Sequence, residues 1–483
     1  MYSRSALLLL STFVACGTPD AERRPSDPPT MDSGFNLAHL DFLGEDVIRG
    51  SDTLRFVHIY AEAPDFRFVG DDDEGIACVD DAARAALVYL RHFELAGDRA
   101  SRNKAIRLLR FVRYMQAPSG LFYNFVTDER LRINTEHENS VANQVSWWTA
   151  RAVWALGTGA RVLAETAPTE AAASEAAIRL VEPHLDHLLA RYGETTVQGG
   201  FTFARWLLYE TASDATSELL LGLVSLERAR PSAAGRDRIR RFAEGLAMAR
   251  FGNLSAFPYG GHASWVGGWH GWGNSQTQAL AEASLYGLVD TALLESAESE
   301  ANSLYARLLV EGWLHEMTFA TGESRAFEQI AYDVRPAAVG LIRLFEATGN
   351  QRYATMAGLA GSWFFGNNAA LAMMADPATG RGYDGILDST RTNPNAGAES
   401  TIESQLTLLE VGRVPEAARW LRVRAEPARS VVLDGARLRI RSFLLDSPRP
   451  TRAVVVVDLS ADTSTVLTDE PAAQFLERVT PTP

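Results

Sequence analysis

The chain has 483 residues, of which 46% are hydrophobic, and its formal net charge at pH 7 is −14. This length and composition are sufficient for a large buried core, built as one large domain or as two domains of ordinary size. The excess of acidic side chains repels phosphate backbones, so nucleic acid is excluded as a partner.

The first 16 residues have the pattern of a bacterial export signal. Arg4 precedes a short apolar run, residues 6–15, which is too short to cross a bilayer as a helix. The run ends in Phe-Val-Ala-Cys, which resembles the bacterial lipobox and implies cleavage before Cys16 and attachment of a lipid to it. We therefore expect an exported lipoprotein at the periplasmic face or the cell surface, held to the membrane by its lipid alone. An ordinary secretory signal with an incidental cysteine is the alternative.

Residues 17–35 are polar, rich in proline and aperiodic, which is typical of a flexible tether. The only other cysteine is Cys78, so lipid on Cys16 would leave no partner for an intrachain disulfide. We expect a catalytic domain over residues 36–427, followed by a small appendage and tail over residues 428–483.

From residue 78 onward, apolar residues recur with helical periodicity, and the pattern breaks at regular intervals. Short and long breaks alternate, which groups the helices into six pairs whose first members begin about 55–70 residues apart. Six such hairpins can close into a ring, with the first helix of each pair inside and the long connections on one rim. The sequence therefore predicts an all-α fold, an (α/α)6 toroid. The predicted helices are 78–97, 100–117, 142–159, 169–192, 213–229, 233–250, 275–293, 296–317, 331–348, 351–365, 400–412 and 414–424.

The last part of the chain has a different pattern. Residues 429–460 contain runs of Val, Leu and Ile around an Asp-Gly turn, as expected for β-strands joined by a hairpin. We therefore predict a small C-terminal β appendage.

The long connections are dominated by Tyr, Trp, Asn, Asp and Gly. Aromatic rings stack on the C–H faces of sugars, while amides and carboxylates bond their hydroxyls, so the set predicts a glycan cleft on the rim. Any one of these aromatic side chains could instead fill the ring or pack a loop. The predicted substrate-binding residues are Tyr123, Asn124, Trp147, Trp148, Trp206, Trp269, His270, Trp272, Tyr332, Tyr383, Asp384 and Asn395.

The chain resembles the six-hairpin (α/α)6-barrel glycosidases. Four stretches resemble bacterial (α/α)6 proteins of glycan metabolism, namely GIACVDDAARAALVYL, WFFGNN, DPATGRGYDGI and NPNAGAESTIES. They are also similar in style to family 9 glycoside hydrolases, although the aspartate pair of that family is not adjacent. The resemblance implies that Asp80 or Asp81 is the base that activates water, and that Glu399 is the acid that protonates the leaving group.

The local sequence bears on these roles. An aspartate at a helix N-terminus is stabilised in its charged form, which suits a base. Ser400 and Glu403 form the pattern of a capping box, so we expect the last inner helix to begin at Ser400, with Glu399 just before it. A general acid needs burial or nearby negative charge, which the two aspartates or the acidic run 71–74 would supply. Alternatively, Asp81 is an ordinary first-turn acid and Glu399 a solvated carboxylate.

We expect no cofactor and no metal. The acidic run 71–74 lacks the spaced ligands of a calcium loop, and His262 and His270 lack a partner carboxylate. The oligomeric state is left open.

The sequence therefore predicts an inverting glycoside hydrolase that acts on an oligo- or polysaccharide outside the cytoplasm. The first alternative is a polysaccharide lyase or sugar epimerase on the same toroid. The second is a non-catalytic glycan-binding lipoprotein. A terpene cyclase is disfavoured by export and by the Asn- and Gly-rich rim. The lyase or epimerase would use Tyr332, Tyr209 or His270 for proton transfer, with Arg205, Arg325 or Arg335 to hold a uronate.

Overall fold

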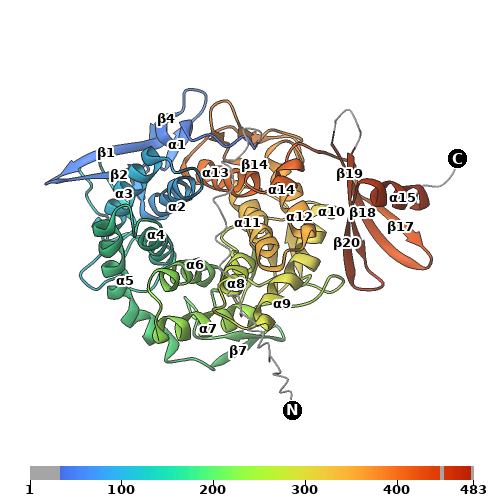
Figure 1. Ribbon diagram of the computed structural model, residues 1–483, viewed down its shortest axis with the longest axis horizontal. Coiled ribbons are helices and arrows are strands. Elements are labelled where there is room, and N and C mark those ends of the chain that lie inside the picture. Colours follow the sequence, from blue (N-terminus) through green and yellow to red (C-terminus); the bar gives the residue numbers. More distant parts are fainter. Residues whose placement is uncertain (1–32, 446–450, 480–483) are drawn as a thin grey trace, which may run out of the picture.

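The computed structural model describes residues 33–445 and 451–479. It contains a closed double ring of helices with a small β-sheet beside it (Figure 1), which confirms the predicted toroid and its β appendage. The predicted signal peptide, the lipid site at Cys16 and nearly all of the tether lie outside the described residues. In the described part of the chain, no helix is both long and apolar enough to cross a membrane.

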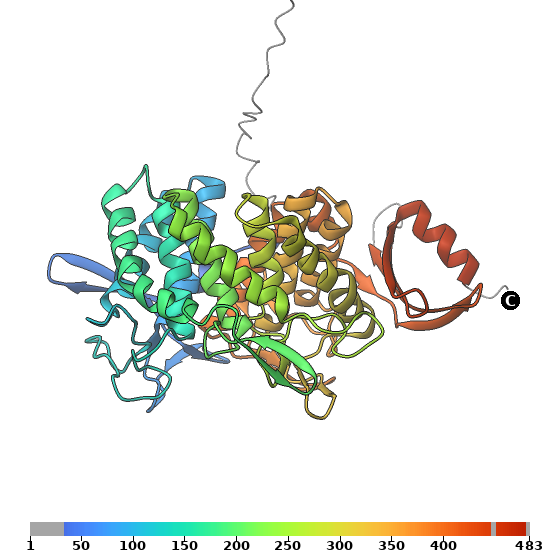
Figure 2. The ribbon, with the colours of Figure 1, turned by 90° about the horizontal axis from the view of Figure 1, so that it is seen from below.

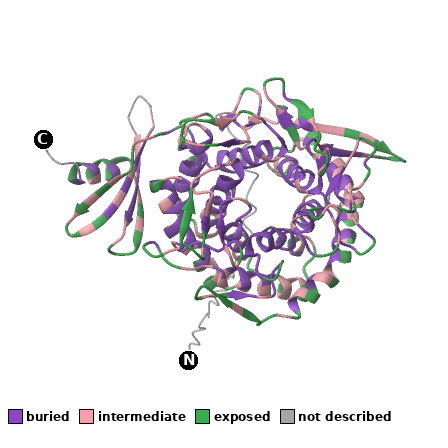
Figure 3. Ribbon diagram, turned by 180° about the vertical axis from the view of Figure 1, so that it is seen from behind, coloured by how far each residue is buried: buried purple, intermediate pink, exposed green. Residues whose placement is uncertain are grey.

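The inner ring consists of six helices that are buried on almost every side (Figure 3). Each inner helix packs against the next, and α13 packs against α2, which closes the ring. A helix buried on all sides needs small or apolar residues around its whole circumference, and the inner helices are accordingly rich in alanine and leucine. The inner helices are α2 (Val79–Ala96), α4 (Trp147–Val162), α6 (Ser213–Ala229), α8 (Gln276–Leu285), α11 (Ala331–Thr348) and α13 (Ala398–Gly412).

The outer helices each cover one side of an inner partner and are amphipathic. In α3, for example, the buried residues include Ala105, Leu108 and Val112, at the spacing of one helical stripe. The fourth outer helix is interrupted by a π-helical turn, and the fifth ends in a 3₁₀ turn. The outer elements are α3 (Arg99–Tyr114), α5 (Pro168–Leu189), α7 (Ala233–Met248), α9 (Thr291–Glu300) with η1 (Ala301–Tyr305) and α10 (Ala306–Glu311), α12 (Gln351–Gly361) with η2 (Ser362–Phe364), and α14 (Pro415–Arg419).

The structure corrects several predicted helix boundaries, among them the following three. Helix α8 ends at Leu285 instead of 293, because Gly287 follows with a φ of +66°. The fourth outer helix begins at Thr291 instead of 296. Helix α13 begins at Ala398, so Glu399 lies in its first turn and not before it.

The predicted capping box is also wrong. Gly397 is the N-cap of α13, and the hydroxyl of Ser400 donates to Asp384 Oδ1 at 2.7 Å. Glu403 does not reach back to the helix start. It is fully buried and bonds Arg84 and Arg335 inside the ring.

The long connections gather on one side of the ring (Figure 2), at the N-terminal ends of the inner helices. They contain short strands that the sequence pattern did not reveal. These are β5 (Ala77–Cys78), β6 (Phe125–Val126), β7 (Thr195–Gln198), β8 (Phe201–Ala204), β9 (Gly268–His270), β10 (Glu316–Thr318), β11 (Glu323–Arg325), β12 (Ala375–Asp376), β13 (Arg381–Gly382), β14 (Gly385–Ile386) and β15 (Thr392–Asn393).

The segment before α2 also contains elements that the sequence pattern does not predict. It forms a short helix and two antiparallel hairpins, the second of which approaches the start of α13. These elements are α1 (Ala38–Leu43), β1 (Gly44–Arg49), β2 (Asp52–Val57), β3 (Tyr60–Glu62) and β4 (Arg67–Val69).

The C-terminal appendage begins slightly earlier than predicted and includes an unpredicted helix. One side of its sheet contributes Val455 and Val457 to the core of the ring, while α15 covers Leu438 and Ile440 on the other side. The sheet runs β16-β18-β19-β20, with β17 also paired to β18. Its elements are β16 (Arg424–Ala425), β17 (Arg429–Leu433), β18 (Ala436–Leu445), β19 (Thr451–Asp458), β20 (Thr463–Thr468) and α15 (Asp469–Val479).

Candidate active site

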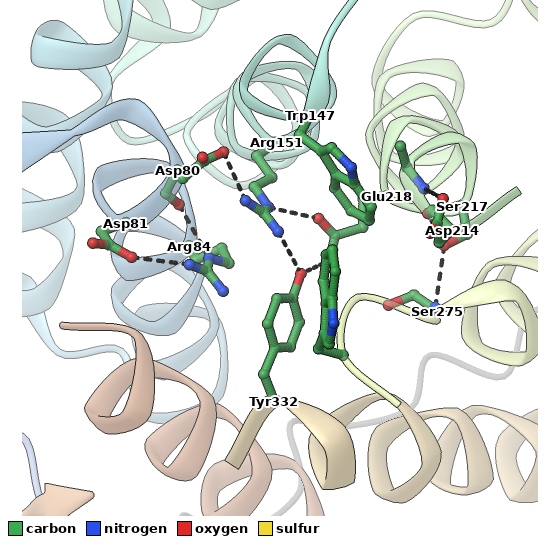
Figure 4. Close-up of polar contacts among 12 residues, drawn as sticks. Asp80, Asp81, Arg84, Trp147, Arg151, Asp214, Ser217, Glu218, Ser275 and Tyr332 are labelled. Atoms are coloured by element: carbon green, nitrogen blue, oxygen red, sulfur yellow. Dashed lines mark hydrogen bonds and ion pairs between the residues drawn. The ribbon is translucent and has the colours of Figure 1, made fainter. Parts of the chain in front are cut away.

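A cavity of about 340 Å³ opens on the rim, at the N-terminal ends of four inner helices. Helices α2, α4, α11 and α13 each place polar side chains in its wall. Figure 4 shows those of α2, α4 and α11. The wall includes all three predicted catalytic carboxylates and two arginines that the sequence did not suggest. These residues are Asp80, Asp81, Glu399, Arg84 and Arg151.

Asp80 and Asp81 are consecutive, so the helix turns their side chains in different directions. Asp80 Oδ1 lies 2.8 Å from Arg151 Nη1, and Asp80 Oδ2 accepts a hydrogen bond from Asn124 Nδ2 at 3.0 Å. Asp81 instead accepts from Arg84 Nη2 at 2.9 Å and from the thiol of Cys78 at 3.2 Å. The side chain of Asp80 is 17% exposed and that of Asp81 only 4%. Asp80 is therefore the aspartate that a ligand can reach.

Glu399 extends from the first turn of α13 into the same cavity, where its side chain is 45% exposed. Its Oε2 atom accepts from Arg84 Nη2 at 3.1 Å. The cavity wall limits access of water to the carboxyl and so raises the pKa of Glu399, and the negative charges of Asp81 and Glu403 add to this effect, while Arg84 opposes it. A raised pKa favours the protonated carboxyl that a general acid needs.

Asp384 holds the start of α13 in place. Its Oδ1 atom accepts from the backbone N–H of Gly397 at 3.0 Å and from the hydroxyl of Ser400 at 2.7 Å. The backbone N–H of Ala398 donates to Ile59 O at 2.9 Å, which ties the same turn to the N-terminal hairpins. Asp384 lines the cavity, as the predicted substrate role requires, and burial raises its pKa.

A layer of buried charges closes the bottom of the cavity. Arg335 Nε donates to Glu403 Oε2 at 2.5 Å and its Nη2 to Glu218 Oε1 at 3.1 Å. Arg84 Nη1 donates to Glu403 Oε1 and Arg151 Nε to Glu218 Oε2, both at 2.9 Å. The layer fixes the two arginines that bind Glu399 and Asp80.

Sequence reasoning missed most of this layer. The signal was present, because Arg84, Arg151, Glu218 and Glu403 are each embedded among small or apolar residues of an inner helix. Arg335, one of the arginines expected to hold a uronate in a lyase or epimerase, is fully buried and already paired with two carboxylates.

Three of the predicted aromatic residues assemble beside the cavity. The ring centroids of Trp147 and Trp272 are 5.5 Å apart, and those of Trp272 and Tyr332 are 6.5 Å apart. Both tryptophans are partly exposed. Tyr332 lines the cavity but is itself buried, and its hydroxyl donates to Glu218 Oε1 at 2.5 Å. Trp147 and Trp272 are therefore the members of this group whose rings remain accessible beside the cavity.

Three other tryptophans do not fit the predicted role, because they are buried and present no free ring face. Trp148 donates its indole N–H to Phe122 O at 2.6 Å, and Trp206 donates its own to Arg241 O at 2.9 Å. Trp269 is 3% exposed, in strand β9.

His270 is also buried, and both of its ring nitrogens are occupied. Nδ1 contacts the carbonyl oxygen of Trp272 at 2.6 Å, and Nε2 lies 3.0 Å from Asp214 Oδ2. Its ring stacks on Trp272 with centroids 3.7 Å apart. His270 therefore supports the tryptophan instead of lining the cavity.

The remaining predicted residues organise the surroundings. Asn124 is buried and bonds both the backbone N–H and the carboxylate of Asp80. Asn395 accepts from the backbone N–H of Ala63 at 3.0 Å. Tyr123 and Tyr383 pack against the hydrophobic core.

The acidic run 71–74 forms a turn in which Asp71 accepts from the backbone N–H groups of Asp73 and Glu74. Within residues 33–445 and 451–479, no group of three or more His, Cys, Asp or Glu side chains has the geometry of a metal site.

No protein-family model matches the chain, and no curated protein matches it in sequence. Solved structures do match its fold. A sugar epimerase from a ruminal bacterium superposes with a TM-score of 0.52 at 12% identity, covering 80% of this chain and 98% of its own. Cellobiose 2-epimerase from Bacillus thermoamylovorans gives 0.52 at 13% identity, covering 74% and 92%. A D-mannose isomerase gives 0.53 at 12% identity, covering 79% and 95%.

At this level of identity the likeness establishes the fold. The chain is a six-hairpin (α/α)6 toroid, and the fold that its sequence motifs indicated is confirmed.

Proposed function

We propose that the protein is an inverting glycoside hydrolase that acts on an oligo- or polysaccharide. The observation that carries the proposal is the placement of Asp80 and Glu399 in one cavity, each on a different arginine. Asp80 faces Arg151, and Glu399 faces Arg84. One carboxyl is partly exposed and has a raised pKa, and the other is held by Asn124 and faces the same space.

In this mechanism Glu399 gives its proton to the glycosidic oxygen as the bond to the anomeric carbon breaks. Asp80 takes a proton from a water molecule, whose oxygen attacks the anomeric carbon from the opposite face. The products are a hemiacetal of inverted configuration and a free hydroxyl on the leaving sugar. Glu399 ends deprotonated and Asp80 protonated, and exchange with solvent restores both.

Asp81 is not suited to be the base. Its Oδ1 and Glu399 Oε2 both bind Arg84 Nη2, so these oxygens cannot lie farther apart than the sum of 2.9 and 3.1 Å. An inverting pair is usually about 6.5–9.5 Å apart, to leave room for water. A retaining nucleophile could be closer, but the side chain of Asp81 is 4% exposed and offers no face to a sugar.

The alternative of a sugar epimerase or lyase needs a histidine or tyrosine poised to move a proton. Among the residues described, no histidine lines the cavity, and the two tyrosines that do are already bonded to carboxylates. Burial raises the pKa of Tyr332, which bonds Glu218, and that of Tyr60, which bonds Glu74. Tyr209 bonds the backbone N–H of Trp147, and burial raises its pKa to about 12. Arg205 pairs with Glu210, and Arg325 with Glu316, so neither is poised to hold a uronate. The site chemistry therefore favours hydrolysis.

A screen of defined oligosaccharides, with products analysed by mass spectrometry, tests the proposal. Hydrolysis adds the mass of one water across the cleaved bond. Cleavage without added water would indicate a lyase, and an unchanged mass with a changed sugar would indicate an epimerase. Binding without any product would indicate a glycan-binding protein.

We further propose that the chain is exported and anchored by lipid on Cys16. The support is the apolar run that ends in Phe-Val-Ala-Cys, followed by a polar segment. Replacing Cys16 by Ser should move the protein from the membrane fraction to the soluble fraction. A variant that stays with the membrane would refute the anchor.

A further inference from the structure

A second cavity, of about 270 Å³, lies at the other end of the inner ring, within the C-terminal halves of the inner helices. All six inner helices contribute to its wall. Trp154 forms part of its floor, and the guanidinium of Arg335, from the buried charged layer, lies 5.5 Å from the Trp154 ring centroid. This cavity shares no residue with the candidate active site.

The wall of the second cavity is strongly charged. It contains the side chains of five arginines and four glutamates, namely Arg91, Arg161, Arg228, Arg343, Arg413, Glu94, Glu282, Glu346 and Glu410. Helix C-termini carry partial negative charge, which accounts for some of the arginines. Four of these five guanidinium groups pair with a carboxylate.

On one side of the cavity the charges are fully paired. Glu410 bonds Arg91 at 2.6 Å, Arg343 at 3.0 Å and Arg413 at 2.7 Å. Glu346 bonds Arg343 at 2.9 Å and Arg413 at 2.7 Å. Each carboxylate here serves at least two guanidinium groups.

The opposite side, between α4 and α6, is different because these two helices touch along their backbones. A Cβ atom on Gly157 would lie 2.3 Å from Gly222 O, and one on Gly222 would lie 2.5 Å from Val153 O. Only glycine allows this approach. It also brings together the arginines that follow on each helix, Arg161 and Arg228.

These two arginines differ in whether they pair with a carboxylate. Arg161 pairs with Glu94, which it shares with Arg91, and its Nε donates to Ser225 Oγ at 3.0 Å. Arg228 stacks on the ring of Tyr286 at 3.6 Å. No carboxylate of the described residues lies within ion-pair distance of Arg228. The protein around its guanidinium limits access of water and lowers the pKa of Arg228, and the positive charge of Arg161 lowers it further, while Glu282 and Glu94 act in the opposite direction.

We propose that this second cavity binds a small oxyanion, a phosphate or sulfate group, between Arg228 and Arg161. Guanidinium groups bind such anions through paired N–H donors, and the Ser225 hydroxyl lies beside them. A phosphate group would give Arg228 the direct ion-pair partner that it lacks among the described residues. The group could come from free phosphate or from a phosphate ester, because the volume of the cavity leaves space beside the anion.

Isothermal titration calorimetry of the full-length protein with inorganic phosphate tests the proposal, with chloride at equal ionic strength as the blank. Arg228→Ala should weaken binding about 10- to 100-fold, the range for loss of a hydrogen bond to a charged group. Arg230→Ala is the matched control, because Arg230 lies on the same segment but pairs with Glu175 on the surface. It should bind as the wild type does. Arg228→Lys keeps the positive charge but lacks the paired N–H donors of a guanidinium. Its affinity should lie between those of the wild type and Arg228→Ala.

Thermal melting of each variant shows whether it is folded, and because Arg228 is exposed and bonds no carboxylate, its replacement should leave the melting temperature nearly unchanged. Glucose 6-phosphate in the same titration distinguishes the sources, since tighter binding than phosphate indicates an ester and weaker binding indicates the free ion. The proposal would be overturned if no binding is detected up to about 10 mM phosphate, because a Kd above that value is too weak for a specific site. Equal binding by wild type and Arg228→Ala would also overturn it.

Discussion

Asp81 and Glu399 bind the same nitrogen atom, Nη2 of Arg84, at 2.9 and 3.1 Å. One positive charge is therefore shared by a buried aspartate and by the glutamate that we propose as the acid. Asp81 raises the pKa of Glu399, and Arg84 lowers it. The two carboxylates are electrostatically coupled, although only Glu399 has a large exposed area in the cavity.

This link makes a prediction for the variant Asp81→Asn. Removing the negative charge of Asp81 removes a cause of the raised pKa of Glu399 and leaves Arg84 more available to it, so that pKa should fall. Because the acid must be protonated, activity is present below its pKa and is lost as the pH rises through it. The basic limb of the kcat/KM profile should therefore move to lower pH. The exposed Asp72→Asn is the control, and a limb that stays in place or moves up would contradict the link.

A second prediction concerns Glu399 itself. Glu399→Gln keeps the shape and the bond to Arg84 but cannot donate a proton to the leaving oxygen. Turnover of natural glycosides should fall about 10²–10⁴-fold, the usual contribution of general acid catalysis. Aryl glycosides with good leaving groups need little protonation and should lose much less. An equal loss on both kinds of substrate would argue against the acid role, and full activity would eliminate it.

The proposed base gives a third prediction. Asp80→Asn retains a partner for Asn124 but cannot accept a proton from water, so kcat should fall about 10²–10⁴-fold for every substrate, whatever its leaving group. Steady-state kinetics on the same substrate pair would show this. Azide, which needs no base, should restore part of the activity on an activated substrate. If Asp80→Asn behaves like Asp72→Asn, another group activates the water.

Substitutions of three tryptophans distinguish a role in glycan binding from a role in core packing. Trp147→Ala or Trp272→Ala should weaken glycan binding by about 1–3 kcal/mol, the range for one buried aromatic contact. Trp269→Ala should instead destabilise the fold by about 3–5 kcal/mol, because it opens a cavity in the core. Calorimetric titration and chemical denaturation of the three variants measure both quantities. Strong destabilisation with unchanged binding in Trp147→Ala would assign that residue to packing.

The sequence was sufficient for the architecture and for the place of the carboxylates. Helical periodicity with regular breaks predicts twelve helices. The alternation of short and long connections predicts that the long ones lie together on one rim. Because the first turns of all inner helices meet at that rim, Asp80 at the start of α2 and Glu399 at the start of α13 had to approach each other. The β appendage followed from its run of branched residues.

Other features depend on contacts between distant residues and could not be read locally. Trp269 is buried because β9 pairs with β10, where Met317 opposes it. Glu403 fits a capping pattern by spacing, but a carboxylate on the inner face of α13 meets Arg84 and Arg335 once the ring closes. The same closure makes Arg335 a buried partner of two carboxylates and leaves it no role in binding substrate.

The stereochemistry of the product tests the central claim most directly. A defined oligosaccharide that the enzyme cleaves is followed by proton NMR from the first minutes, before the new reducing end mutarotates. We predict that the fresh product has the anomeric configuration opposite to that of the cleaved bond, and that Glu399→Gln forms it far more slowly. Retained configuration would contradict the assignment of Asp80 and Glu399 as an inverting pair, and an isomerised sugar with no bond cleaved would contradict hydrolysis itself.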